Sequence, residues 1–422
     1  MASQTNCPNC GAQIPVPTGA RAWCERCDWN VGGETPDLDE SFFELQYARI
    51  SQRYAKATLE TLKATPVKNL LPRWTIRKAI AFGLAASVHL LTLTLLVTGI
   101  VVVVTGFPAF ASIFWGAALC ALVWLMRPKP GKVPSRDLVD GKDFPALHAF
   151  VNQVAKELGG RPVNKIVVNE SYNAAYGVFG WHRVPVLWIG LPLWVALPPQ
   201  ERLAIIGHEI AHGVNGDATR GFIVGSALNA LDEWIGLLRG PFYQARTFFE
   251  RAVGSLIWIL SIPFAAVQSL LAQLLWLDKQ QAEYFADYLA STVAGTEAVV
   301  STLRRAGCVE HLDDVLLRNA YSISQSGARI LGLFRERIAR LPDREWQRLA
   351  RASQREGARL DASHPPTAYR IEFLNAHVVA RPRIVATEEM MRTIDTELDA
   401  VQEKLGQRLI AEIEKKALFG AR

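Results

Sequence analysis

Two long apolar runs constrain this 422-residue chain more than any other feature. Residues 79–104 contain no acidic or basic side chain apart from His89, and residues 107–126 contain none. About 20 apolar residues suffice for a helix to cross a bilayer. Because only residues 105–108 connect the two runs, the pattern predicts a transmembrane helical hairpin over residues 79–126. A buried hairpin of a soluble core would need far more protein around it. We interpret His89 as a tolerated polar residue that faces a neighbouring helix.

Basic residues flank this hairpin on both sides. They are Lys68, Arg73, Arg77 and Lys78 before it, and Arg127, Lys129, Lys132 and Arg136 after it. The positive-inside rule therefore places both flanks in the cytoplasm, as expected for a multi-pass protein of the cell membrane with its N-terminus and main domain on that side. Anionic lipids are a simpler partner than nucleic acid for the net charge of +6. Residues 1–72 lack the apolar core of a cleavable signal.

Residues 208–212 read His-Glu-Ile-Ala-His. Pro198 and Pro199 favour a helix start, and Asn215 is followed by a glycine that favours a stop, so both histidines lie on one helical face. Two imidazoles at this spacing can share a tetrahedral zinc ion with a third protein ligand and a water that Glu209 can deprotonate. The alternative, a histidine pair satisfied by other core groups, is costly in so apolar a helix.

Glu283 and Asp287 lie one helical turn apart, so both carboxylates face the same way. Glu283 can serve as the third zinc ligand, and Asp287 can accept the free ring N–H of a ligand histidine. Composition alone favours the alternative that the two form a solvated acidic face.

Four ordered segments resemble the HtpX-like membrane metallopeptidases, the family that also holds the CAAX prenyl endopeptidases. The stretch 208–220, HEIAHGVNGDATR, is similar to the zinc helix of that family and the turn after it. The other matches are Asn173-Ala174-Ala175-Tyr176 followed by the apolar run 184–190, the pair Glu283 and Asp287, and Ser363-His364-Pro365-Pro366-Thr367 followed by Arg370-Ile371. The resemblance covers about residues 140–378.

This resemblance implies a role for each matching residue. His208, His212 and Glu283 are the implied zinc ligands, Glu209 is the general base, and Asp287 orients a ligand. His364 is the implied donor to the oxyanion, with a buried turn histidine as the alternative. Asn173 and Ala174 are the implied substrate-binding residues. The strand at 184–190 can bind substrate if it forms a sheet edge, or can be an ordinary core strand.

The N-terminus contains two Cys-x-x-Cys pairs separated by thirteen residues, Cys7 with Cys10 and Cys24 with Cys27. Four thiolates at this spacing predict a structural zinc ribbon, and disulfides would not persist in the cytoplasm. Redox-active cysteines are the minor alternative. The ribbon can be a small folded cap or a recognition module. Its aromatic and basic residues form only a weak nucleic-acid pattern, so no nucleic-acid partner is expected.

We expect five regions. They are a zinc ribbon at 1–35, an amphipathic connector at 36–78, the hairpin at 79–126, a metallopeptidase domain at 137–380 and a charged C-terminal helix at 381–422. Within the connector, helical spacing runs through Phe42, Leu45, Ile50, Leu59 and Leu62. Residues 330–360 and 388–416 read as charged surface helices.

A further apolar stretch, residues 252–277, lies between two parts of the proposed zinc site. Because His212 and Glu283 must meet at one metal, the chain between them crosses a membrane either twice or not at all. Asn229, Asp232 and Glu233 make a partner span at 222–238 expensive. We therefore expect a membrane-associated arm at 221–277, although family members commonly have two membrane helices here.

The sequence thus predicts an α+β, mostly helical protein with a zincin-type metallopeptidase domain that contains a small sheet. The predicted function is a membrane-anchored zinc endopeptidase that cleaves membrane or membrane-proximal proteins at the cytoplasmic face for quality control. It would hold one catalytic and one structural zinc. The alternative is a zinc-stabilised membrane scaffold that only binds, and Glu209 favours the enzyme because a structural site needs no base.

Overall fold

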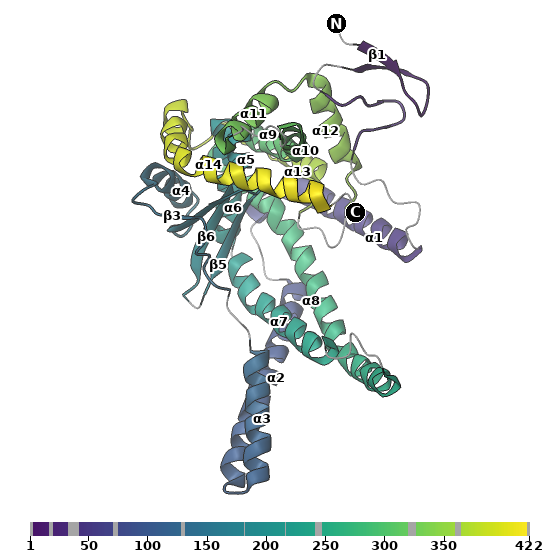
Figure 1. Cartoon of the computed structure of the whole chain (residues 1–422), viewed down its shortest axis with the longest axis vertical. Coiled ribbons are helices and arrows are strands. Elements are labelled where there is room, and N and C mark those ends of the chain that lie inside the picture. The colour runs from purple at the N-terminus through teal and green to yellow at the C-terminus, as the bar shows by residue number, and fades with distance from the viewer. Residues whose placement is uncertain are drawn as a thin grey trace. The chain divides into compact units, whose positions relative to one another are not determined.

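The computed structural model describes residues 3–16, 20–32, 42–70, 75–127, 131–180, 182–215, 217–240, 247–319, 326–358 and 364–419. The chain divides into two compact units. The first contains Met1–Leu71, Val133–Asn215 and Gln281–Arg422, and the second contains Pro72–Lys132 and Gly216–Gln280. Helices dominate both units, and the first also contains two small sheets (Figure 1). The predicted α+β, mostly helical class is confirmed.

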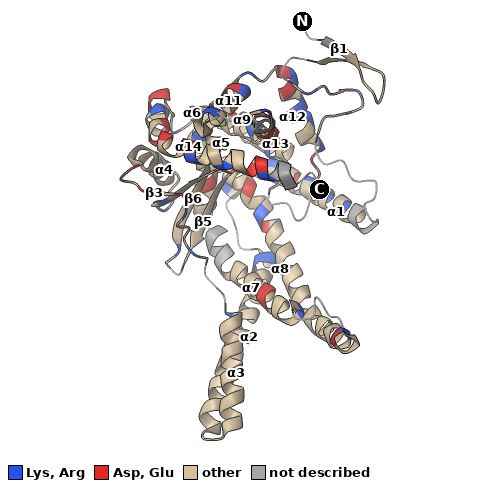
Figure 2. Ribbon diagram, in the orientation of Figure 1, with Lys and Arg blue, Asp and Glu red and all other residues tan. Residues whose placement is uncertain are grey.

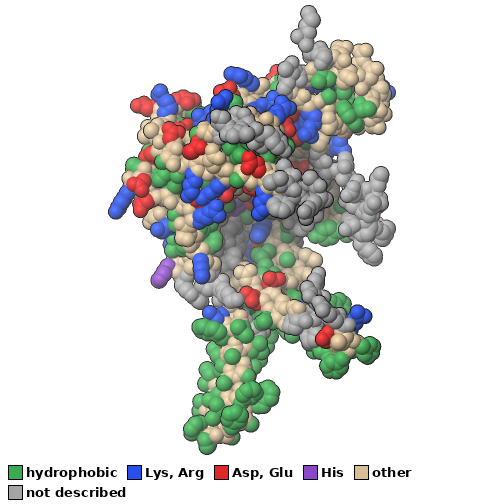
Figure 3. Space-filling model, in the orientation of Figure 1, with side chains coloured by type: hydrophobic (Ala, Val, Ile, Leu, Met, Phe, Trp, Pro, Cys, Tyr) green, Lys and Arg blue, Asp and Glu red, His purple; other side chains and the backbone are tan. Residues whose placement is uncertain are grey.

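The predicted hairpin is a pair of packed helices in the second unit. Helix α2 spans Ile76–Gly106 and α3 spans Phe110–Met126. Their backbones approach closely because both contact positions are glycines, and a Cβ on Gly116 would lie 2.7 Å from the carbonyl oxygen of Gly99. Residues 79–126 carry no Lys, Arg, Asp or Glu, and their outward surface is apolar (Figures 2 and 3).

One further helix, and the part of another that precedes Gln281, complete this unit. Helix α7, Asp217–Arg239, packs on the first half of α2 around Ala85 and Ala227, and α8 spans Phe248–Ala294. The His89 imidazole lies 3.1 Å from the Ser226 hydroxyl on α7, so it faces a neighbouring helix as predicted. Among the described residues, α2 and α8 are long and apolar enough to cross a membrane, whereas α3 is shorter.

The main sheet of the first unit has four strands in the order β3-β4-β6-β5. They are β3 Leu138–Val139, β4 Lys165–Asn169, β5 Ala174–Phe179 and β6 Val184–Gly190. Strand β6 pairs in parallel with β4 on one side and antiparallel with β5 on the other. The suggestion that residues 184–190 form the sheet edge is therefore wrong, because both sides of that strand are already paired. The edge strand is β5.

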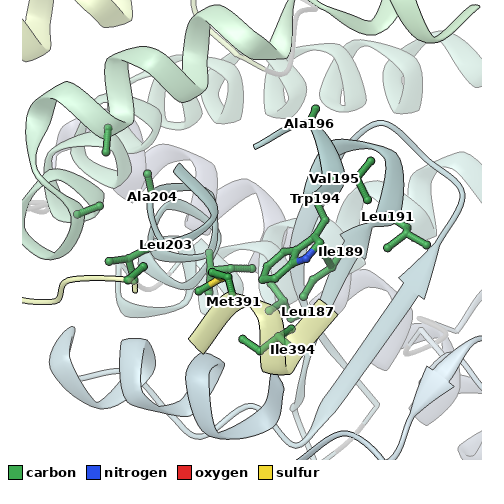
Figure 4. Close-up of a cluster of buried hydrophobic side chains, with 14 of the residues drawn as sticks. Leu187, Ile189, Leu191, Trp194, Val195, Ala196, Leu203, Ala204, Met391 and Ile394 are labelled. Carbon is green, nitrogen blue, oxygen red and sulfur yellow. The ribbon is translucent and has the colours of Figure 1, made fainter. Parts of the chain in front are cut away.

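The sheet packs against helices through one large apolar core. Part of it is visible in Figure 4, where Trp194 of α5 (Leu191–Ala196) lies among Leu187, Leu203, Met391 and Ile394. The remaining helices of this unit are α1 Phe42–Ala64, the 3-10 helix η1 Val67–Asn69, α4 Pro145–Glu157, α6 Pro199–Val214, α9 Thr296–Ala306, α10 Val309–Asn319, α11 Gly327–Ala339, α12 Asp343–Arg355, α13 Thr367–Ala376 and α14 Glu388–Phe419.

The three helices expected at the protein surface bury more than predicted. Helix α14 places Ile394, Leu398 and Leu405 in the core, and Asp395 accepts hydrogen bonds of 2.9 Å from both Trp194 and Arg202. These contacts make α14 a core element. Helix α11 likewise buries Ile330, Leu331 and Phe334. In α12, Glu345 and Arg348 are fully buried, so its charged residues are not simply a solvated face.

The connector helix α1 is amphipathic and buries Leu59 as predicted, but Ser51 rather than Ile50 lies on its buried side. Ser51, Ala55 and Leu59 are buried, whereas Ile50 is 61% exposed. The side chains of Phe42 and Leu45 lie outside the described set. Near the middle of α1, Gln52 donates a 2.9 Å hydrogen bond to Tyr369 on α13. The connector is thus packed onto the metallopeptidase domain.

Candidate active site

Helix α6 carries the His-Glu-x-x-His segment and has the predicted bounds, with Pro198 before its first turn and Asn215 at its C-terminal end. His208 and Glu209 are buried. The imidazole rings of His208 and His212 stand at 89° to each other, and their Nε2 atoms lie 3.3 Å apart. Because of the helical spacing, both Nε2 atoms therefore point toward the same position.

The third predicted ligand, Glu283, reaches the same point from α8. Its Oε1 lies 3.4 Å from Nε2 of His212, and its Oε2 lies 3.5 Å from Nε2 of His208. Tetrahedral ligands at roughly 2.0–2.1 Å from zinc are separated by about 3.3–3.4 Å from each other. Two imidazoles and a carboxylate are also a common donor set for catalytic zinc. The residues present therefore fit a zinc ion.

Asp287 is fully buried beside this group, one turn after Glu283. Its Oδ1 lies 3.0 Å from Nδ1 of His208, which is the contact predicted for a residue that orients a ligand. Arg370 from α13 donates two hydrogen bonds to the same carboxylate, at 2.7 and 2.8 Å. The sequence motif contained Arg370, but its role was missed because a guanidinium on a remote helix has no periodicity that links it to α6.

Burial and ion pairing oppose each other in these groups. Burial favours a raised pKa for Asp287 and Glu283, but hydrogen bonds and nearby cationic groups outweigh it, so the pKa of Asp287 is lowered and that of Glu283 is lowered well below its usual value. Burial also favours a lowered pKa for His208, yet its two carboxylate neighbours raise it to about 10. The carboxylates of Glu283 and Asp287 are therefore ionised, and a cation at the site stabilises their negative charge.

His364 joins the same cluster from the turn before α13. Its Nδ1 lies 2.6 Å from Oε2 of Glu283, and one donor atom each from His208, Glu283 and His364 falls within 4.8 Å. Its side chain is 49% exposed, so the alternative of a buried turn histidine is wrong. The two prolines that follow it are buried. Ser363 of the same motif lies outside the described residues.

Glu209 lies on α6 directly after the first histidine and is 7% exposed. Within the described part of the chain, its carboxylate has no hydrogen bond or ion-pair partner that would occupy it. The carboxylate experiences the positive charge of the buried Arg370. This arrangement leaves its oxygens free to accept a proton.

Asn173 and Ala174 lie at the start of the edge strand β5. The carbonyl oxygen of Asn173 accepts a 2.8 Å hydrogen bond from the amide of Gly190, and Ala174 begins the ladder with β6. Gly213 on α6 packs against the ring of Tyr176, leaving no room for a larger side chain. The edge strand therefore runs beside the helix that carries His208 and His212.

The four N-terminal cysteines converge around the hairpin formed by β1 Ser3–Asn6 and β2 Gln13–Val16. Their Sγ atoms approach to 3.6 Å between Cys7 and Cys27 and between Cys10 and Cys24. None forms a disulfide. A tetrahedral zinc ion with Zn–S distances of about 2.3 Å separates its sulfurs by about 3.8 Å. This cluster also fits zinc.

Comparison with known proteins agrees with this arrangement. Residues 142–378 match the model of peptidase family M48. The chain is 27% identical to Protease HtpX of Pseudomonas fluorescens over 236 residues, which are 54% of this chain and 70% of that protein. It is 28% identical to a Protease HtpX homolog of Bordetella avium over 184 residues, 42% of this chain and 61% of that protein. It is also 28% identical to Protease HtpX of Nitrosococcus oceani over 203 residues, 47% of this chain and 59% of that protein.

No solved structure matches the chain. The family match, however, covers more than half of the chain's residues and includes His208, His212 and Glu283. Together with that match, the observed donor set leads to one conclusion: this chain belongs to peptidase family M48 and is an HtpX-like metallopeptidase.

Proposed function

We propose that this protein is a membrane-anchored zinc endopeptidase whose catalytic centre is held by His208, His212 and Glu283. The observation that carries the proposal is the convergence of donor atoms from these three residues: the two Nε2 atoms lie 3.3 Å apart, and the two Glu283 oxygens lie 3.4 and 3.5 Å from them. A zinc ion held there supplies Lewis acidity, which activates water and a peptide carbonyl.

The chain's own residues supply the remaining chemistry. Glu209 accepts the proton of the attacking water and returns it to the amine that leaves. Asp287 holds the Nδ1–H of His208, so that the opposite nitrogen, Nε2, remains available as a ligand atom. His364, half-exposed beside Glu283, donates a hydrogen bond to the oxygen on which negative charge develops.

We assign substrate binding to the edge strand β5. One side of β5 is unpaired within the four-stranded sheet, and Asn173 and Ala174 lie at the start of the strand. An extended peptide can add to such an edge through backbone hydrogen bonds, which bind without demanding a particular sequence. Strand addition also requires an unfolded segment, which supports a role in removing damaged membrane proteins.

Membrane anchoring is supported by the apolar helices of the second unit. Large side chains on α2 and α3 are exposed, such as Leu90 at 63% and Trp115 at 68%. An apolar surface of this extent is unusual in a soluble protein and suits lipid. The basic residues at both ends of the hairpin support a cytoplasmic location for the peptidase domain. For residues 221–277 we propose the predicted membrane-associated arm rather than a pair of membrane crossings.

We also assign a structural zinc to the four-cysteine ribbon. Its internal apolar cluster is small, with Ile14 buried beside Cys7 and Cys24. A segment with so little buried surface needs a metal to stay folded.

The activity test uses the full chain purified in detergent with zinc and an unfolded membrane protein as substrate. Cleavage should be lost in Glu209→Gln and after chelation, while Glu209→Gln should still bind two zinc ions per chain. A wild-type protein that binds both metals but cleaves none of several substrates would contradict the proposal and support a scaffold.

A further inference from the structure

Helix α12 presents a row of arginines to the zinc ribbon. Arg344, Arg348, Arg351 and Arg355 are spaced by four, three and four residues, which places them on one helical face. We call this row the arginine face. Each member contacts the ribbon between residues 23 and 31.

Three members of the arginine face, Arg344, Arg351 and Arg355, contact side chains and carbonyl groups around the second cysteine pair. The Arg344 guanidinium lies 4.4 Å from the centre of the Trp23 ring and donates to the carbonyl of Trp23 at 3.2 Å. Arg351 donates two hydrogen bonds, at 2.9 and 3.1 Å, to the carboxylate of Asp28. Arg355 donates to the carbonyl oxygen of Asp28 at 3.1 Å.

Arg348 is the buried centre of this interface. It is 1% exposed and donates at 2.6 Å to the carbonyl oxygen of Val31. The same guanidinium is paired with Glu345 on α12 and with Glu310 on α10. Burial lowers the pKa of Arg348 to about 10, so it remains charged at neutral pH. A buried cation in such a network needs each of its partners.

The ribbon groups bound by this face lie next to metal-binding cysteines. Trp23 precedes Cys24, and Asp28 follows Cys27. Asp28 adopts a left-handed backbone conformation with φ of 56°, which the turn after the second cysteine pair imposes. The positions of these groups therefore depend on the fold of the ribbon around its second cysteine pair.

The other end of α12 is tied to the helix that serves the catalytic centre. Glu356 at the C-terminal end of α12 accepts a 3.2 Å hydrogen bond from the amide of Thr367, the first residue of α13. His364 lies three residues before Thr367, and Arg370, which holds Asp287, lies three residues after it. A displacement of α12 therefore moves Thr367, and with it the segment that contains both His364 and Arg370.

We propose that the ribbon is a positioning module for the catalytic centre, which docks on the arginine face of α12 and thereby holds His364 and Arg370 in place through the junction of α12 with α13. The inference rests on the proposed ribbon metal and on the proposed peptidase activity. It assigns the ribbon a role in the peptidase beyond that of a separate folded cap.

The first test weakens docking without touching a cysteine or the buried Arg348. The triple variant Arg344→Gln, Arg351→Gln and Arg355→Gln removes three cations from the interface. A matched control, Arg329→Gln, Arg340→Gln and Arg392→Gln, removes three exposed cations, from α11, from the residue that follows α11 and from α14, that make no ribbon contact among the described residues. Both are prepared as the full chain in detergent, and thermal melting with zinc content checks that each is folded.

We expect the docking variant to keep two zinc ions and an unchanged exchange rate in the sheet. Amide hydrogen exchange of residues 364–376 should accelerate about tenfold, and kcat should fall by a similar factor with KM little changed, since the loss of three partly exposed charged contacts acts on that scale. The matched control should resemble wild type. The corresponding Arg→Lys triple keeps the charges but loses the paired Arg351 hydrogen bonds to Asp28, so it should recover kcat only in part.

A second variant, Cys24→Ser with Cys27→Ser, removes the ribbon metal and should accelerate exchange in the same residues 364–376. The inference is overturned if exchange rises in residues 20–32 and 343–355 while residues 364–376 and kcat stay at wild-type values. A wild-type protein without cleavage would instead contradict the proposed function. In that case the exchange of residues 364–376 still decides the inference.

Discussion

Arg370 on α13 and Asp287 on α8 form an ion pair with two hydrogen bonds, directly behind His208. Asp287 is 0% exposed and Arg370 is 8% exposed. The same Asp287 carboxylate lies 3.0 Å from Nδ1 of His208. A residue 162 positions away along the sequence from His208 thus helps to set the orientation of that imidazole.

Replacing Asp287 with Asn should lower the affinity of the catalytic site for zinc by about 10- to 100-fold, because the amide cannot balance Arg370 and binds the His208 N–H more weakly. Competition with a chromophoric chelator measures this affinity. Asp399→Asn, an exposed change on α14, is the matched control and should bind zinc as wild type does. Equal zinc affinity in the two variants would show that Asp287 does not support the metal.

Replacing His364 with Gln should lower kcat by about 10²- to 10³-fold while the catalytic zinc is retained, because a donor to the developing oxyanion is lost. Zinc content and steady-state kinetics on one peptide separate the two effects. His377→Gln at the other end of α13, where the ring contacts the carbonyl of Leu62, should retain kcat. Loss of zinc from His364→Gln in proportion to its activity would instead indicate a ligand.

Replacing Gly406 with Ala should destabilise the first unit by about 1–3 kcal/mol. A Cβ at this position would overlap the backbone of Gly327, where α14 crosses α11. The control is Gly332→Ala on α11, whose Cβ meets nothing within 4 Å and which should stabilise the helix by about 0.5–1 kcal/mol. Chemical unfolding compares the two, and equal stability would mean that the crossing tolerates a methyl group.

Replacing Asp137 with Asn should make stability less dependent on pH in the acid range. Arg408 donates hydrogen bonds to the Asp137 carboxylate at 2.5 and 3.0 Å, and these bonds, opposed by partial burial, lower its pKa. A lowered folded-state pKa means that the stabilisation is present above the unfolded value of about 3.9 and is lost as the pH falls through the lower, folded value.

The stability difference between wild type and Asp137→Asn should therefore be largest near pH 7, on the order of 1 kcal/mol, and should shrink below about pH 4. Asn is the matched replacement because Asp137 has φ of 59°, a conformation that Asn also tolerates. Urea unfolding at several pH values measures the difference. A constant difference down to pH 2 would show that this ion pair is not responsible.

Local patterns in the sequence predicted the parts of this protein whose geometry depends on neighbours along the chain. The spacing of His208 and His212 determines that they share a helical face, since the helical repeat alone decides it. The Cys-x-x-Cys pairs and the uncharged runs of α2 and α3 are equally local. The peptidase family also followed from these segments, because their order along the chain is itself a sequence property.

Only the tertiary structure decided what those segments meet. It brought Glu283 and His364 to the two histidines, made β5 rather than β6 the sheet edge, and turned the arginine face of α12 toward the ribbon. The physical reason is that strand pairing and long-range ion pairs join residues whose separation along the chain carries no periodic signal. The charges of α12 have the same helical spacing whether they face water or a folded ribbon, and only packing distinguishes the two.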